Sequence, residues 1–263
     1  MTSCTEGPIL RRGLGTYTQS AQSLLGPTQR RIPRCAPGGR QPVAASEHLK
    51  DFKSVWAGSC QSMWAELLAL SIAESHVVAN YGALPSSQLL TDAFYVPALR
   101  NRVGDLTKDR FLERVPIYRQ SVITNRLVVL SASFETYLGN FLEAYIQSRP
   151  KYFDSALGAR TTAGDKLLGD VIKVRGLVER ITKFGELASA RTNSITPSLP
   201  FLRDVYTLRN VLAHRAGTVD QLAADSLVHV KFGVGDRVVL TTDQLLLLAT
   251  PVIEIARDLD AKI

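Results

Sequence analysis

Residues 208–220 read LRNVLAHRAGTVD and place an arginine, an amide and a histidine close together. Asn210 and His214 are four positions apart, so a helix would stack them on one side, with Arg209 on its flank. Gly217 predicts the end of that helix, because glycine readily adopts the left-handed conformation that terminates helices. His214 would then lie at a helix C-terminus, which favours the charged imidazolium and suits a proton donor or a switch.

A purely structural interpretation of the same residues is also open. A histidine or arginine in the last turn before a terminating glycine can satisfy free helix carbonyls. No Ser-His-Asp arrangement or phosphate-binding glycine loop is evident, and the remaining histidines and the cysteines lack metal-ligand spacing. These are His48, His76, His229, Cys4, Cys35 and Cys60. We therefore expect no metal and no cofactor.

The elements that position these residues are mostly helical. Apolar residues recur at three and four positions over residues 47–80, 118–148, 165–190, 199–214 and 242–262, which predicts helices there. Shorter helical pieces are expected over residues 86–115, ending before Pro116. The two alternating runs around GVGD, within residues 228–242, predict a β-hairpin. The fold class is thus all-α, with four to five long helices and a small C-terminal β-hairpin.

Two stripes are expected on the helix that carries the motif. Ser198 is its expected cap, and Pro200 is tolerable in its first turn. A helical projection gives a buried stripe of Phe201, Val205, Leu208 and Leu212. The opposite stripe is polar, and consists of Arg203, Thr207, Asn210 and His214. After the hairpin, Thr241 and Gln244 predict a capping box at the start of the last helix.

Composition divides the chain in two. Residues 1–45 carry six arginines and one acidic residue, are rich in glycine and proline, and have few large apolar residues, so we expect a disordered basic tail. Residues 46–263 carry 25 basic and 23 acidic side chains, so the expected helical domain is nearly neutral despite the net charge of +7. We expect no transmembrane helix, no secretory signal and a reduced, cytoplasmic setting.

The stretch RNVLAHRAG, residues 209–217, resembles the signature of HEPN domains, in which an arginine, a polar residue, a short spacer and a histidine follow one another. The run NRLVVLSASFETYLGNFLEAYI, residues 125–146, is similar to the long core helix of bacterial members of this family. The resemblance covers about residues 47–262 and is nearest to the subgroup associated with ribosomal L-PSP-type proteins.

The resemblance implies a HEPN-like helical bundle and a metal-independent endoribonuclease of the toxin or defence type. HEPN ribonucleases are described as dimers that bring two motifs into one cleft, so it also implies a homodimer that acts on RNA. In this chemistry His214 would move the proton of a ribose 2′-hydroxyl, and Arg209 would stabilise charge on the phosphate. Asn210 would orient His214 or hold a phosphate oxygen, with Glu135, Arg203 and Thr207 as supporting residues.

A second interpretation stays open beside the first. The chain would be a non-catalytic HEPN module that binds a nucleotide, an RNA or a partner protein, and Arg209 and His214 would serve as contacts or caps. The three motif positions favour the enzyme, whereas the nearly neutral domain favours the binding module. An antitoxin or regulatory protein would be a partner compatible with either interpretation.

Overall fold

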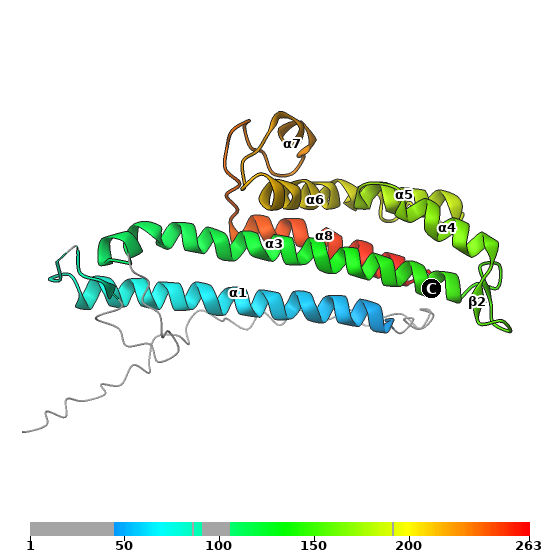
Figure 1. The fold of residues 1–263 in the computed structure, drawn as a ribbon, viewed down its shortest axis with the longest axis horizontal. Coiled ribbons are helices and arrows are strands. Elements are labelled where there is room, and N and C mark those ends of the chain that lie inside the picture. The colour runs from blue at the N-terminus through cyan, green and yellow to red at the C-terminus, as the bar shows by residue number, and fades with distance from the viewer. Residues whose placement is uncertain (1–44, 86, 91–105, 191) are drawn as a thin grey trace, which may run out of the picture. The chain divides into compact units, whose positions relative to one another are not determined.

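The computed structural model describes residues 45–85, 87–90, 106–190 and 192–263, all within the compact unit formed by residues 43–263. Figure 1 shows its elements, which are helical apart from one short β-ladder. In chain order they are α1 (Glu47–Asn80), α3 (Lys108–Gln147), β1 (Phe153–Asp154), β2 (Ala159–Arg160), α4 (Thr162–Ile172), α5 (Leu177–Leu187), the 3-10 turn η1 (Thr196–Ser198), α6 (Leu199–His214), α7 (Gln221–Ser226) and α8 (Thr242–Asp260). The mostly helical fold expected from the periodicity is therefore confirmed.

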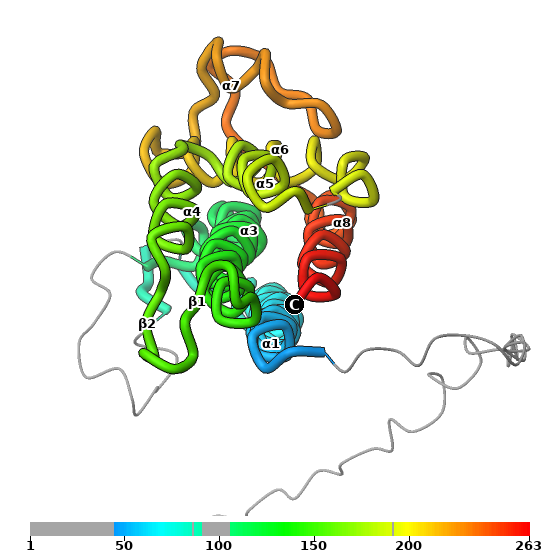
Figure 2. Tube along the Cα trace, turned by 90° about the vertical axis from the view of Figure 1, so that its right-hand side faces the viewer, coloured from blue at the N-terminus to red at the C-terminus, as the bar shows by residue number. Residues whose placement is uncertain are grey.

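Helix α3 is the central element, with α1, α8, α6 and α4 packed around it (Figure 2). Its buried face is an apolar stripe at helical spacing that includes four aromatic rings, Phe134, Tyr137, Phe141 and Tyr145. Phe184 of α5 meets Phe141 and Tyr145 edge to face, at ring-centroid distances of 5.2 and 4.9 Å. Such pairs add stability beyond the burial of their area, so these rings fix α5 against α3.

Polar contacts join the start of α1 to the end of α8, and α8 to the central helix α3. Ser46 caps α1, since its hydroxyl oxygen accepts a hydrogen bond from the Leu49 amide, and it also donates to Asp260 at the end of α8. The Asp260 carboxylate accepts a second bond from the Ser46 amide, at 2.9 Å. The buried Tyr137 hydroxyl donates to the Ala256 carbonyl at 2.6 Å, and burial raises the pKa of this hydroxyl well above its usual value.

The start of α8 is tied to α3 by a side-chain amide. Gln120 donates to the Leu240 carbonyl at 3.1 Å and accepts from the Leu240 amide at 2.9 Å. The capping box expected at Thr241 and Gln244 is confirmed, because each side chain binds the backbone of the other residue. Within the described residues, no helix is both long and apolar enough to cross a bilayer.

The prediction that a helix ends before Pro116 is wrong. Helix α3 begins at Lys108 and continues through Pro116, although an interior proline costs about 3 kcal/mol. Tertiary contacts hold the helix on both sides of the proline: Val115 is fully buried, and Arg119 forms an ion pair with Glu74 of α1 at 2.6 Å. The other helical pieces expected around Pro97 and Gly104 lie outside the described residues.

The single helix expected over residues 165–190 is two helices. Gly176 separates α4 from α5 with a φ of +91°, which glycine adopts without strain. An added Cβ would meet only the flexible carboxylate end of Glu179, so the positive φ is what calls for glycine here. The apolar spacing continues across the break, so periodicity alone did not reveal it. The ladder of β1 and β2 was likewise not predicted.

The expected C-terminal β-hairpin is wrong as well. Segment 235–238 pairs with residues 217–219 instead of with residues 228–232: the Val219 amide binds the Asp236 carbonyl at 2.9 Å, and the Val238 amide binds the Gly217 carbonyl at 2.9 Å. In the described residues this pairing amounts to one isolated bridge, between Thr218 and Arg237. The expected basic tail lies outside the described residues except for its last position.

Candidate functional site on helix α6

Helix α6 ends in the way that the glycine signal predicted. Ala216 and Gly217 both adopt the left-handed conformation, with φ values of +49° and +79°. The Val211 carbonyl accepts hydrogen bonds from the Arg215 amide at 3.0 Å and the Gly217 amide at 3.1 Å. Backbone groups therefore satisfy this carbonyl at the helix end, and the exposed His214 side chain is left for other contacts.

The buried face of α6 is rotated from the expected one. Its apolar residues below 3 % exposure are Leu202, Val205, Leu208 and Val211, which face α3 and α8. Phe201 and Leu212, expected in the same stripe, are only partly buried. The ring of Phe201 stacks on the ring of His229, with the ring centroids 3.4 Å apart.

The three motif side chains lie together at the C-terminal end of α6. Nη1 of Arg209 donates to Oδ1 of Asn210 at 3.0 Å, and the same nitrogen lies 3.4 Å from Nε2 of His214. The side chain of Arg209 thus turns from the flank of the helix toward the polar stripe. One guanidinium nitrogen bridges an amide and an imidazole at a solvent-accessible surface.

This geometry sets the roles that the atoms can take. A guanidinium only donates hydrogen bonds, so the contact with His214 is a hydrogen bond when Nε2 carries no proton. Nε2 has a single lone pair, so it can take a proton from a bound group once Arg209 turns away from it. The remaining N–H groups of Arg209 are available to oxygen atoms of an anion, because a guanidinium carries five donors in one plane.

The expected supporting residues divide into two groups. Glu135 binds Arg180 of α5 at 3.1 Å, and Arg203 lies 3.8 Å from Glu179 of the same helix. These two ion pairs join α5 to α3 and α6, and within the described residues neither Glu135 nor Arg203 contacts the motif. Thr207, in contrast, lines a hollow between α6 and α7 together with Asn210.

A buried acidic residue on α6 was missed. Asp204 is fully buried, and its carboxylate accepts hydrogen bonds from the Val228 amide at 2.9 Å and the His229 amide at 2.6 Å. Nδ1 of His229 lies 3.2 Å from the same carboxylate. The signal in the sequence was an aspartate inside an apolar stretch of the helix, next to Val205 on the buried side. Its partners, the amides of Val228 and His229, could not be predicted because they lie more than twenty residues further along the chain.

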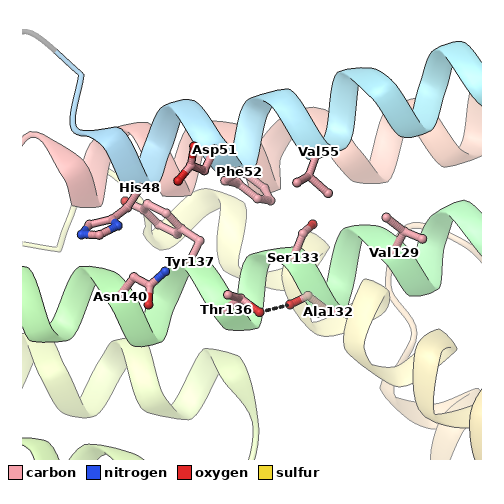
Figure 3. A pocket seen from close by; sticks show the side chains of 10 residues that line it. All are labelled: His48, Asp51, Phe52, Val55, Val129, Ala132, Ser133, Thr136, Tyr137 and Asn140. Atoms are coloured by element: carbon pink, nitrogen blue, oxygen red, sulfur yellow. Dashed lines mark hydrogen bonds between the residues drawn. The ribbon is translucent and has the colours of Figure 1, made fainter.

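A larger hollow, of about 350 Å³, lies between α1 and α3 (Figure 3). His48, Asp51 and Asn140 stand at its polar end, but the hydroxyls of Ser133 and Thr136 donate to carbonyls of their own helix. Within the described residues, the polar side chains of this hollow that remain for a ligand are therefore those of His48, Asp51 and Asn140.

Thiol and metal chemistry find no support in the described part of the chain. Burial raises the pKa of the Cys60 thiol on α1, so this thiol is a poor nucleophile at neutral pH. No three His, Cys, Asp or Glu side chains among the described residues are placed to hold a metal ion.

The Arg209–Asn210–His214 cluster is therefore the strongest candidate site among the described residues. It combines a proton-exchanging ring, an anion-binding fork and an amide on one accessible helix end. The chain matches no protein-family model, and neither a curated protein nor a solved structure is significantly similar to it.

Proposed function

We propose that the chain is a cytoplasmic endoribonuclease of the HEPN type, acting without a metal in toxin or defence biology. The observation that carries the proposal is the bridging position of Arg209, with one nitrogen 3.0 Å from Asn210 and 3.4 Å from His214. The HEPN resemblance of residues 209–217 supports it. The exposure of His214 supports it further. Backbone amides already satisfy the Val211 carbonyl at the helix end, so His214 is not needed there as a cap.

In the proposed reaction Arg209 turns from His214 to the phosphate. A ribose 2′-hydroxyl then attacks the adjacent phosphorus while the freed Nε2 of His214 takes its proton. The bond from phosphorus to the 5′-oxygen breaks, and the 5′-oxygen receives a proton, directly from His214 or through water. The products are a 2′,3′-cyclic phosphate and a 5′-hydroxyl, with no net change in protons. Arg209 stabilises the charge that grows on the phosphate oxygens, and Asn210 holds Arg209 in place.

A second function, binding without cleavage, is favoured by two observations. The domain of residues 46–263 is nearly neutral. The ion pairs Glu135–Arg180 and Arg203–Glu179 join helices to one another and do not contact the cluster within the described residues. In this function Arg209 and His214 would bind the phosphate of a nucleotide or an RNA, or an acidic group of a partner protein.

The test is RNA cleavage by the purified chain in the presence of a chelator, with His214→Ala as the variant. Loss of proton transfer should lower the rate by about 10²–10⁴-fold. The melting temperature should change by less than about 2 °C, because an exposed side chain contributes little to folding. His48→Ala, which removes a histidine from α1, is the matched control and should cleave at the original rate.

Two other outcomes have distinct meanings. Cleavage that requires a divalent metal, or that survives His214→Ala, contradicts the mechanism. If neither protein cleaves RNA but the wild-type chain binds it and His214→Ala binds it more weakly, the non-catalytic function holds instead.

A further inference from the structure

The hollow between α6 and α7 adjoins the motif cluster through Asn210. Its volume is about 140 Å³, room for about five water molecules. The apolar part of its wall comes from Val211, Leu222 and Ala223. The Asn210 side chain belongs to both places: Oδ1 accepts from Arg209, and the residue also lines the hollow. A molecule held at Arg209 and His214 would therefore meet this hollow directly.

Thr207 differs from the comparable threonines of the other helices. Threonine hydroxyls inside helices commonly donate to the carbonyl four residues earlier. Thr124, Thr136, Thr182 and Thr250 all do so. In the described part of the chain the Thr207 hydroxyl makes no hydrogen bond, and it lines the hollow. Nδ2 of Asn210 is likewise unpaired within the described residues, so both groups are available to a ligand.

The other polar side chains of the hollow each have a partner within the protein. Arg215 forms an ion pair with Asp220, and Asp220 also caps α7 by accepting from the Ala223 amide at 2.9 Å. The Ser226 hydroxyl donates to the Leu222 carbonyl. These contacts hold the wall formed by α7, whereas the Thr207 hydroxyl and the Asn210 amide nitrogen have no partner within the described residues.

We infer that this hollow binds a pyrimidine base of single-stranded RNA, next to a phosphate held by Arg209 and His214. The inference rests on the proposed function for the position of the phosphate. A free amide N–H requires an acceptor, which a pyrimidine carbonyl supplies, and a hydroxyl can donate or accept. The apolar wall suits the face of a flat ring.

The experiment measures binding of uridine 3′-monophosphate and adenosine 3′-monophosphate to the full chain by calorimetry, and then cleavage of dinucleotides. The uridine nucleotide should bind more tightly. Thr207→Val, which keeps the shape and removes the hydroxyl, should weaken its binding by about five- to tenfold. Thr250→Val on α8 is the matched control and should bind like the original chain. Ser226→Leu, which fills the hollow, should abolish the preference for uridine.

The binding and cleavage arms separate this inference from the proposed function. Selective uridine binding that is weakened by Thr207→Val supports the base site even if the chain cleaves no RNA. Cleavage without a pyrimidine preference, and unchanged by Thr207→Val, overturns the base site and leaves the ribonuclease intact. Equal binding of uridine nucleotide, adenosine nucleotide and inorganic phosphate shows a phosphate site only, and also overturns it.

Discussion

Arg209 contacts both other residues of the cluster through its guanidinium group. Its guanidinium reaches Asn210 and His214 with one nitrogen and keeps other N–H groups free for a phosphate. Lysine carries the same charge but only a compact ammonium, which cannot make this planar set of contacts. Charge alone is therefore not what the position requires.

We predict that Arg209→Lys lowers the RNA cleavage rate about as much as Arg209→Ala, by roughly 10²–10³-fold. Single-turnover cleavage in chelator measures it. Arg257→Lys, an exposed position on α8, is the control and should leave the rate unchanged. A lysine variant that retains most of the activity would show that only a positive charge is needed.

For single residues, the sequence predicted the contacts between side chains that are close along the chain. Arg209, Asn210 and His214 lie within one and a half helical turns, so their proximity follows from the helix itself. The buried partners of Asp204 and the bonds of Glu135 and Arg203 to α5 depend on segments far away in the chain. Those contacts could not be derived without the packing of the helices.

Among the elements, the loop of residues 227–240 is held by α6 near its start and by the bridge to residues 217–219 near its end, instead of by pairing within itself. Asp204 accepts from two consecutive amides of this loop, at Val228 and His229. The alternating apolar residues that suggested a hairpin are used differently, since Val230, Val238 and Leu240 are buried against the helical core. Alternation reports that one side of a segment is buried, but it does not identify the partner.

We predict that Asp204→Ala lowers the free energy of unfolding by about 2–4 kcal/mol, because two loop amides lose a buried, charged acceptor. Asp204→Asn should also destabilise the protein, since its amide nitrogen would face one of those N–H groups. Urea denaturation measures both. Asp170→Ala on α4, which removes a carboxylate without a hydrogen bond in the described residues, is the control. Equal stability of Asp204→Ala and the original chain would contradict the clamp.

The helix boundaries show the same division between local and distant causes. The starts of α1, α6 and α8 were close to the predicted positions, and capping side chains mark two of them, Ser46 and Thr241. Ser198 stands at the N-cap position of α6, as expected, but its side chain makes no capping hydrogen bond. The break at Gly176 and the continuation through Pro116 depend on packing. A helix can continue through a glycine or a proline, or end there, and the tertiary contacts around the residue decide which.

For the whole molecule, we predict a homodimer. The accessible polar stripe on α6 is short, and two copies in one cleft would double the groups that meet an RNA strand. Sedimentation at micromolar concentration should give about twice the chain mass of 28.8 kDa. Cleavage per chain should fall on dilution below the dimer dissociation constant. A monomer that cleaves RNA at full rate would refute a composite site.

The hydrogen bonds between Gln120 and Leu240 lie between two parts of α3 that differ in burial. On their C-terminal side α3 is buried at every turn up to Ile146, whereas on their N-terminal side Val115 is the buried apolar residue. Pro116 has no N–H, so the carbonyl four residues before it, that of Leu112, lacks its usual helical partner. Amide hydrogens of residues 108–115 should therefore exchange with solvent through local opening, while those of residues 127–142 should exchange only on global unfolding. Exchange monitored by mass spectrometry would resolve these two segments, and equal protection along α3 would show that the helix opens as one unit.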